Sequence, residues 1–277
     1  MIACELDVAC LSRIGATIFT MNSLRYFPVA GGLFCLVWWW RRDFFLPWRI
    51  QARFPKAERI FYELKHSLGT ILIFTVIGVT TVAMGRSGWN AMYFDIGEYG
   101  IAYLLLSFVL LHAWQETWFY WMHRAVHRKR WFRLVHLTHH KSTSPSPFAA
   151  YGFHPLEAVL EGIYPTLLAF VLPLHPVVVI AQIQFTMILN IWWHSGYEVF
   201  PSGWTRGRVT SWINTATHHD MHHMYVNGNY SLYFNFWDRW MGTNFANYHE
   251  YFESVVARRE RLRAERTRAE VAVPRGA

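Results

Sequence analysis

Nine of the fifteen histidines in this 277-residue chain lie in three short clusters, and histidine is the side chain best suited to hold a transition metal near neutral pH. The clusters are spaced HxxxH, HxxHH and HHxxHH. Positions i, i+3 and i+4 share one face of an α-helix, so each cluster can direct two or three imidazoles at one point. Many nitrogen ligands without thiolate suit iron, zinc, copper or nickel. The clustered residues are His123, His127, His136, His139, His140, His218, His219, His222 and His223.

Several side chains outside the clusters are candidates for the same site. Glu116 lies two helical turns before His123 on the same face, and we expect its carboxylate to orient a ligand histidine through a hydrogen bond. His194 ends an apolar run and is expected to be a ligand, while Asn190, one turn earlier, is either a weak ligand or a supporting residue. His154 is equally well explained as a ligand or as a helix cap. The other histidines lack a clustered partner and are expected to be structural: His66, His112, His175 and His249.

The composition is that of a membrane protein. Hydrophobic residues make up 53% of the chain and charged residues only 16%, against ~25% charged in a typical soluble domain. The net charge of +8 comes from basic residues beside apolar stretches, as the positive-inside rule produces, and we expect no nucleic-acid partner. Cys4, Cys10 and Cys35 have no CxxC spacing, so neither a thiolate metal site nor a disulfide framework is expected.

The apolar pattern predicts an all-α fold, a polytopic membrane bundle of about four to five helices. Glu5 and Asp7 argue against a cleaved signal peptide. The basic loop 41–65 is assigned to the cytoplasm, and counting crossings from it brings all three histidine clusters to that side. The predicted membrane segments are 24–40, 68–84, 97–122 and a hairpin within 155–199 that turns at 173–176.

Three regions follow from this pattern. Residues 1–95 are expected to form N-terminal membrane helices and a basic cytoplasmic loop. Residues 96–252 would form the domain that carries the histidine clusters, and residues 253–277 a basic cytoplasmic tail in which arginine and glutamate alternate.

Three motifs resemble the fatty acid hydroxylase/sterol desaturase superfamily of membrane di-iron oxygenases. They are ETWFYWMHRAVH at 116–127, HLTHH at 136–140, and HHDMHH at 218–223, with WDRWMGT at 237–243 downstream. The resemblance covers about residues 100–250. It implies two iron ions held in a cytoplasmic, histidine-rich helical cap, with dioxygen as co-substrate, and the hydroxylation or desaturation of a membrane lipid. Residues 96–252 would then be a fatty acid hydroxylase-like catalytic domain. By position it assigns as ligands His123, His127, His136, His139, His140, His219, His222 and His223, with His194 between the motifs.

The chain departs from this family's pattern at three positions. The family often has aspartate where Glu116 stands, some members have a histidine near Asn190, and His218 is an additional histidine before the usual HxxHH. We include His218 among the candidate ligands. These departures leave open which residues complete the coordination of each iron.

The sequence contains no dinucleotide-binding GxGxxG, ferredoxin-type cysteine set or haem signature, so electrons are expected from a separate donor, a ferredoxin or a cytochrome with its reductase. A pterin reductant stays open as well. Two other classes of membrane protein would show different patterns. A zinc or divalent-metal transporter would carry its histidines within the spans, and a zinc hydrolase would need a motif such as HExxH, which the sequence lacks. The sequence is equally compatible with sterol, carotenoid, fatty acyl and sphingolipid substrates.

Overall fold

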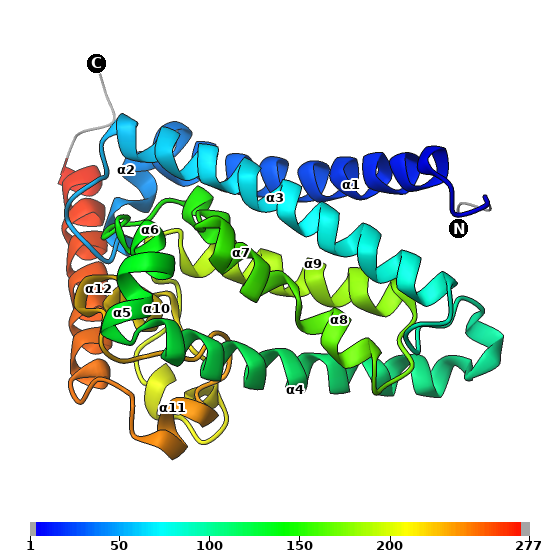
Figure 1. Ribbon diagram of the computed structural model, residues 1–277. Helices are drawn as coiled ribbons and strands as arrows, with labels where there is room; N and C mark the ends of the chain where they lie inside the picture. The colour runs from blue at the N-terminus through cyan, green and yellow to red at the C-terminus, as the bar shows by residue number, and fades with distance from the viewer. Residues whose placement is uncertain (1–3, 273–277) are drawn as a thin grey trace.

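The computed structural model describes residues 4–272, and in this range the chain is helical, with three isolated β-bridges and no strand (Figure 1). The prediction of an all-α fold is therefore confirmed. Four long helices run along the bundle and a cap of shorter segments closes one end. The long helices are α1 (Val8–Phe34), α3 (Ala57–Arg86), α4 (Gly100–Val126) and α9 (Pro176–Trp193).

Helices α1 and α3 lie side by side along one edge of the bundle (Figure 1). α1 begins at Val8, where the Asp7 side chain accepts a hydrogen bond from the Cys10 backbone, and it continues through Pro28. The first apolar run was expected over 24–40, so the helix starts earlier than predicted. It also ends earlier, because Cys35–Trp40 forms a π-helical turn, η1, which leads into the cap.

The predicted hairpin within 155–199 is present, but only one of its arms is a continuous helix. The first arm is divided into α7 (Pro155–Gly162) and α8 (Tyr164–Ala169), and the second is α9. α7 packs closely on α3, since a Cβ atom added at Gly162 would lie 2.7 Å from the Phe74 ring.

The remaining segments are short, apart from the C-terminal helix, and most of them build the cap. In Figure 1 helix α12 stands across the end of the bundle beside α10. The segments are α2 (Arg42–Phe45), η2 (Leu46–Trp48), η3 (Ile96–Glu98), α5 (Lys129–Trp131), η4 (Phe132–His136), α6 (Leu137–His140), η5 (Pro147–Tyr151), η6 (Trp204–Arg206), η7 (Thr210–Trp212), α10 (Ala216–Tyr225), α11 (Phe236–Met241) and α12 (Tyr248–Ala272).

Within residues 4–272, two helices are long and apolar enough to cross a membrane, α3 and α9. Only 28% of the residues in the most apolar part of each are buried, so many of their apolar side chains are exposed or partly exposed, as those of a membrane helix are. The structure thus agrees with a membrane helical protein. The expected number of four to five spans stays a prediction.

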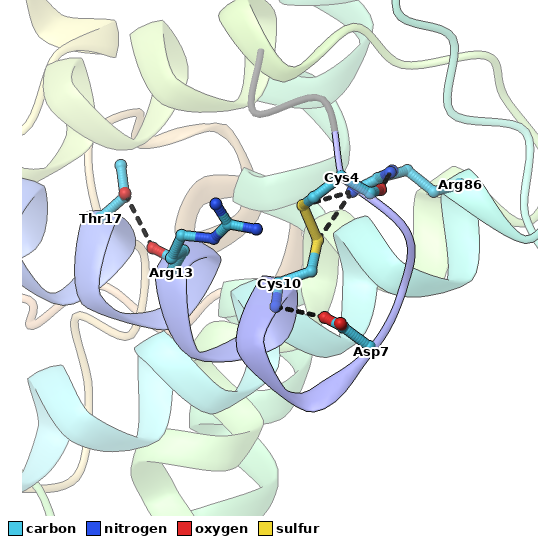
Figure 2. Close-up of a disulfide and its surroundings, with 6 residues drawn as sticks. All are labelled: Cys4, Asp7, Cys10, Arg13, Thr17 and Arg86. Atoms are coloured by element: carbon cyan, nitrogen blue, oxygen red, sulfur yellow. Dashed lines mark hydrogen bonds between the residues drawn. A yellow bond between two sulfur atoms is a disulfide. The ribbon is translucent and has the colours of Figure 1, made fainter.

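A disulfide joins Cys4 to Cys10 where α1 begins, at the end of the bundle opposite the cap (Figures 1 and 2). The Arg86 guanidinium, at the end of α3, donates to the Cys4 carbonyl oxygen and lies 3.3 Å from the Cys10 sulfur. The expectation that the cysteines form no disulfide framework is therefore wrong for this pair. It rested on the lack of CxxC spacing, whereas the first turn of α1 brings residues six apart within reach. Cys35 is free and exposed.

Candidate metal centre

Nine buried histidines from four parts of the chain converge at the cap end of the bundle. The end of α4, the η4–α6 segment, the end of α9 and helix α10 each contribute at least one. They form two groups, and within each group the ligand nitrogens lie within 4.8 Å of one another. The first group is His123, His127, His136, His140 and His222, and the second is His139, His194, His219 and His223.

Each HxxHH motif is divided between the two groups. In the motif of η4–α6, His136 and His140 belong to the first group and His139 to the second. In the motif of α10 the assignment is reversed, with only His222 in the first group. This division follows from helix geometry, because side chains at i+3 and i+4 point about 100° apart. The groups are adjacent, and the rings of His140 and His223 are 5.0 Å apart between centroids.

The imidazole nitrogens are spaced as ligands of one ion would be. The Nε2 atoms of His123 and His136 are 3.0 Å apart in the first group, and those of His219 and His194 are 2.9 Å apart in the second. Metal–imidazole bonds are about 2.0–2.1 Å long, which at octahedral to tetrahedral angles separates neighbouring nitrogens by roughly 2.9–3.4 Å. The residues therefore fit a transition metal in each group. Nitrogen ligands alone allow iron, zinc, copper or nickel.

The outer ring nitrogens of several of these histidines have hydrogen-bond partners that fix the direction of Nε2. Glu157 Oε1 lies 2.6 Å from His136 Nδ1, and the side chains of both residues are at most 2% exposed. Backbone carbonyl oxygens serve the others, each 2.8 Å from Nδ1: that of Tyr230 at His123, Asn190 at His194 and Gly228 at His222. Such partners set the tautomer and raise the basicity of a ligand imidazole.

Burial keeps the α10 histidines neutral. It holds the pKa of His219, His222 and His223 well below the ordinary value, and the neighbouring imidazoles lower it further. A neutral imidazole offers a lone pair to a metal, so these three side chains are in the form that metal binding requires.

Helix α10 is held in place at its first turn. The Thr215 side chain caps the helix by accepting a hydrogen bond from the His218 backbone at 3.1 Å. Glu198, which is 1% exposed, accepts from both the backbone and the hydroxyl of Thr217. Donors at a helix N-terminus favour a carboxylate, so these contacts orient the helix that supplies three candidate ligands.

Glu116 does not occupy the place expected for it. Its carboxylate is buried and accepts a 3.3 Å hydrogen bond from the Phe234 backbone instead of one from a ligand histidine. Glu157 orients a ligand histidine in its place, although the histidine motifs and their spacing do not point to this residue. A usable signal was present, because Glu157 is an acidic residue within the apolar stretch 155–199 and therefore needs a partner there.

His218 is buried but belongs to neither group. Its Nε2 lies 3.2 Å from Asn244 Oδ1 and 3.5 Å from Asp238 Oδ2. Asp238 in turn accepts from the backbone of Tyr230 and of Ser231. The inclusion of His218 among the candidate ligands is therefore not supported by the geometry. On α10 it lies next to His219, and neighbouring helical residues point about 100° apart.

His154 and Asn190, for each of which the sequence allows two roles, make hydrogen bonds to backbone groups. The His154 ring accepts from the Leu156 backbone and caps α7, while the Asn190 amide donates to the Ala150 carbonyl oxygen. The histidines that lack a clustered partner also lie outside both groups. For example, His175 caps α9.

A mainly apolar cavity of about 200 Å³ lies between α1, α3, α7, α8 and α9. It adjoins a much smaller cavity bounded by candidate ligands, among them His136 and His194. The two cavities share four lining residues: Phe153, Glu161, Asn190 and Leu232. The larger cavity therefore lies directly beside the cavity that the candidate ligands line.

Comparison with known proteins places these features in a family. Residues 108–243 match the family model described as fatty acid hydroxylase. This range contains all nine grouped histidines.

Curated relatives carry sterol-enzyme names. The chain is 30% identical over 190 residues to a lathosterol oxidase of Homo sapiens, an alignment that covers 67% of this chain and 60% of the relative. It is 33% identical over 193 residues to a Delta(7)-sterol 5(6)-desaturase of Leptosphaeria maculans, covering 67% and 50%. A Delta(7)-sterol 5(6)-desaturase of Gibberella zeae is 28% identical over 192 residues, covering 69% and 58%.

The matched part of the chain spans about three fifths or less of the length of these relatives. No solved structure matches the chain. The fatty acid hydroxylase match lies over the two histidine groups, and the relatives are sterol desaturases and oxidases. From both findings, the chain belongs to the fatty acid hydroxylase/sterol desaturase superfamily.

Proposed function

We propose that this protein is a membrane-bound di-iron oxygenase that hydroxylates or desaturates a lipid with dioxygen and external electrons. One observation carries the proposal: two adjacent groups of buried imidazoles adjoin an apolar cavity large enough for part of a lipid. The names of the relatives support a sterol or a related lipid as substrate.

Two ions are proposed because the nitrogens divide into five and four, and one ion commonly takes three or four protein ligands. When bound, such ions supply the oxidising chemistry with dioxygen that removal of hydrogen from an unactivated C–H bond requires. Acid–base side chains alone do not provide it.

The protein's own part is to bind, orient and exclude water. The histidines hold the ions, and Glu157 fixes the ring of His136. The apolar walls of the larger cavity align a hydrocarbon and keep bulk water from the site. Glu116 is retained only as a supporting residue, since its carboxylate holds the Phe234 backbone beside the cavity-lining Tyr233.

Electrons would reach the site from a separate donor protein. Exposed Arg128, Lys129 and Arg130 lie on the cap directly after His127, and they form a basic surface that suits an acidic ferredoxin or cytochrome. We propose that this surface faces the cytoplasm and that the protein is a multi-pass membrane protein, in agreement with the positive-inside rule.

Metal analysis combined with product formation tests the proposal. Protein purified from iron-supplied cells is expected to hold about two iron ions per chain. With dioxygen and a chemically reduced ferredoxin, it is expected to convert lathosterol or another membrane lipid to a product that is either oxygenated or two hydrogens poorer. One zinc ion per chain, with no lipid product from any donor, would instead favour a membrane zinc-binding protein.

A further inference from the structure

The larger cavity has unpaired polar groups at the end that adjoins the histidine groups, which we call its metal end. Glu161 lines both cavities, and none of the hydrogen bonds or ion pairs within residues 4–272 involves its carboxylate. Asn190 also lines both, and its buried Oδ1 has no partner in the described part of the chain. Both residues are one helical turn from the site, because Glu161 follows Glu157 on α7 and Asn190 precedes His194 on α9.

Arg25 adds a donor to this end of the cavity. Its Nε donates to the Met21 carbonyl oxygen and its Nη2 to Asn22, while the buried Nη1 has no acceptor among residues 4–272. The adjacent Tyr26 donates to the carbonyl oxygen of Phe148 in η5, the same segment that Asn190 contacts through Ala150. Arg25 and Asn190 are therefore at similar depth in the bundle.

The opposite end of the cavity is different, because its polar groups are paired with each other. The hydroxyls of Thr81 and Thr166 are 2.6 Å apart. Along α9 the cavity is lined from Pro176 to Asn190, a rise of about 21 Å at 1.5 Å per residue. The cavity is thus long, with apolar or paired groups at one end and unpaired polar groups at the other.

An unpaired buried donor and unpaired acceptors indicate the chemistry of a ligand that would pair with both. No ion pair joins Arg25 to Glu161 in the described chain, so both stay available. A hydroxyl group donates one hydrogen bond and accepts others, which matches Glu161 and Asn190 on one side and Arg25 on the other. A lipid carboxylate would instead meet the oxygens of Glu161 and Asn190, which repel it.

We propose that the cavity binds a lipid alcohol with its hydroxyl at the metal end, between Arg25, Glu161 and Asn190, and its hydrocarbon body along α9 towards Pro176. The C–H bond that reacts then lies within a few bonds of the hydroxyl, and the far end of the hydrocarbon is not oxidised. This inference rests on the proposed function, because it takes the cavity to be the substrate site.

Photo-crosslinking in membranes tests the orientation. The probe is a 3β-hydroxysterol with a diazirine at the end of its side chain, and the adduct is mapped by mass spectrometry. We expect the adduct on the outer half of α9, between Pro176 and Ile183, or on the α3 residues near Thr81. An unlabelled hydroxysterol is expected to compete with the probe at least roughly tenfold better than its O-methyl ether, which lacks the donor.

Substitutions test the residues. Glu161→Gln and Arg25→Met are each expected to reduce competed labelling by roughly tenfold or more, while bound metal stays at the wild-type level. Matched controls at exposed positions, Glu58→Gln on α3 and Arg13→Met on α1, are expected to label as the wild type does. Glu161→Gln preserves side-chain shape, so it gives a result even if Arg25→Met does not fold.

The outcomes separate this inference from the proposed function. Adducts near Phe153 or Leu232, or equal competition by the ether, would overturn the orientation, and the proposed function would stand if the wild type still oxidises a lipid. Better competition by a fatty acid than by the alcohol would overturn the assignment of a hydroxyl. Absence of both competed labelling and lipid oxidation would remove the proposed function as well.

Discussion

Each candidate ligand histidine has two ring nitrogens, and where the outer one has a hydrogen-bond partner, that partner fixes the direction of the inner one. Three of the outer nitrogens lie against backbone carbonyl oxygens, whose positions are set by the fold. His136 differs, because its partner is the carboxylate of Glu157. A single side-chain change can therefore release His136 while leaving every ligand in place.

Glu157→Gln is expected to lower metal affinity or activity by roughly 10- to 100-fold, because the amide orients His136 without the negative charge that raises its basicity. Metal content by elemental analysis under competition with a chelator measures the effect. Glu116→Gln is the matched control. It is expected to have a smaller effect, since Glu116 contacts the Phe234 backbone. Equal losses in the two variants would contradict the different roles assigned to the two carboxylates.

His222 and His218 are expected to respond differently to replacement by alanine, although they belong to one motif. His222→Ala removes a nitrogen of the first group and should abolish lipid oxidation and lower bound metal. His218→Ala leaves both groups complete but removes buried contacts with Asn244 and Asp238, which costs about 1–3 kcal/mol of stability. Metal content and the unfolding temperature distinguish the two effects. Loss of metal in His218→Ala at full folding would make His218 a ligand.

The spacing of the histidines was enough to predict eight of the nine grouped residues, because i, i+3 and i+4 relations survive any packing of the helices. His194 was predicted instead from its place at the end of an apolar run. The spacing could not show that His218 points elsewhere, since HHxxHH contains two i, i+4 pairs, His218 with His222 and His219 with His223. The partner of His136 was also beyond a pattern argument. Glu157 and His136 are on different segments, and only the packing of α7 against η4 brings them together.

At the scale of elements, the site depends on the start of α10. This helix has only ten residues, and its interior carries histidines and an aspartate instead of strong helix formers. The cap at Thr215 and the contacts of Glu198 with Thr217 therefore add to the packing of α10 against α9 and α12 in holding the helix.

Thr215→Ala is expected to destabilise the protein by about 1 kcal/mol and to weaken metal binding, because α10 loses its capping oxygen. The variant also loses a contact between the Thr215 hydroxyl and that of Tyr248 at 3.2 Å. Thr215→Ser keeps the oxygen and should behave as the wild type. Thermal unfolding with and without metal measures both effects. An unchanged metal affinity in Thr215→Ala would show that the two histidine groups do not depend on the N-terminal capping of α10 by Thr215.

The long apolar helices were predictable from hydrophobicity, and their ends were less so. The segment predicted at 68–84 is part of the thirty-residue α3, which extends towards the cap through polar residues such as Glu58. The break between α7 and α8 has no proline at Ile163 to mark it, although Pro165 follows in the first turn of α8. Boundaries of this kind are set by tertiary packing, which sequence periodicity does not contain.

The whole molecule has two chemically different ends. The two histidine groups and the basic surface are at the cap, and the Cys4–Cys10 disulfide is at the opposite end of the bundle. Disulfides persist mainly in oxidising compartments. A cap that faces the cytoplasm and a disulfide end that faces away from it are therefore mutually consistent.

Cysteine labelling is expected to confirm this orientation. In a Cys35→Ser background, Arg130→Cys and Ala264→Cys should react with an impermeant maleimide only after the membrane is opened, because both positions are exposed on the cap side. Ser87→Cys, exposed at the far end of α3, should react in sealed cells. Labelling of Arg130→Cys in sealed cells would refute the cytoplasmic cap.

The division of each HxxHH motif between the two groups also has a thermodynamic consequence. His139 and His140 are bonded neighbours that serve different groups, and so are His222 and His223. An ion bound in one group therefore immobilises backbone on which the other group depends, and the second ion binds to a site whose ordering entropy is already lost. Metal uptake should be cooperative. In a titration followed by native mass spectrometry, chains with one ion should be scarcer at half saturation than independent binding allows.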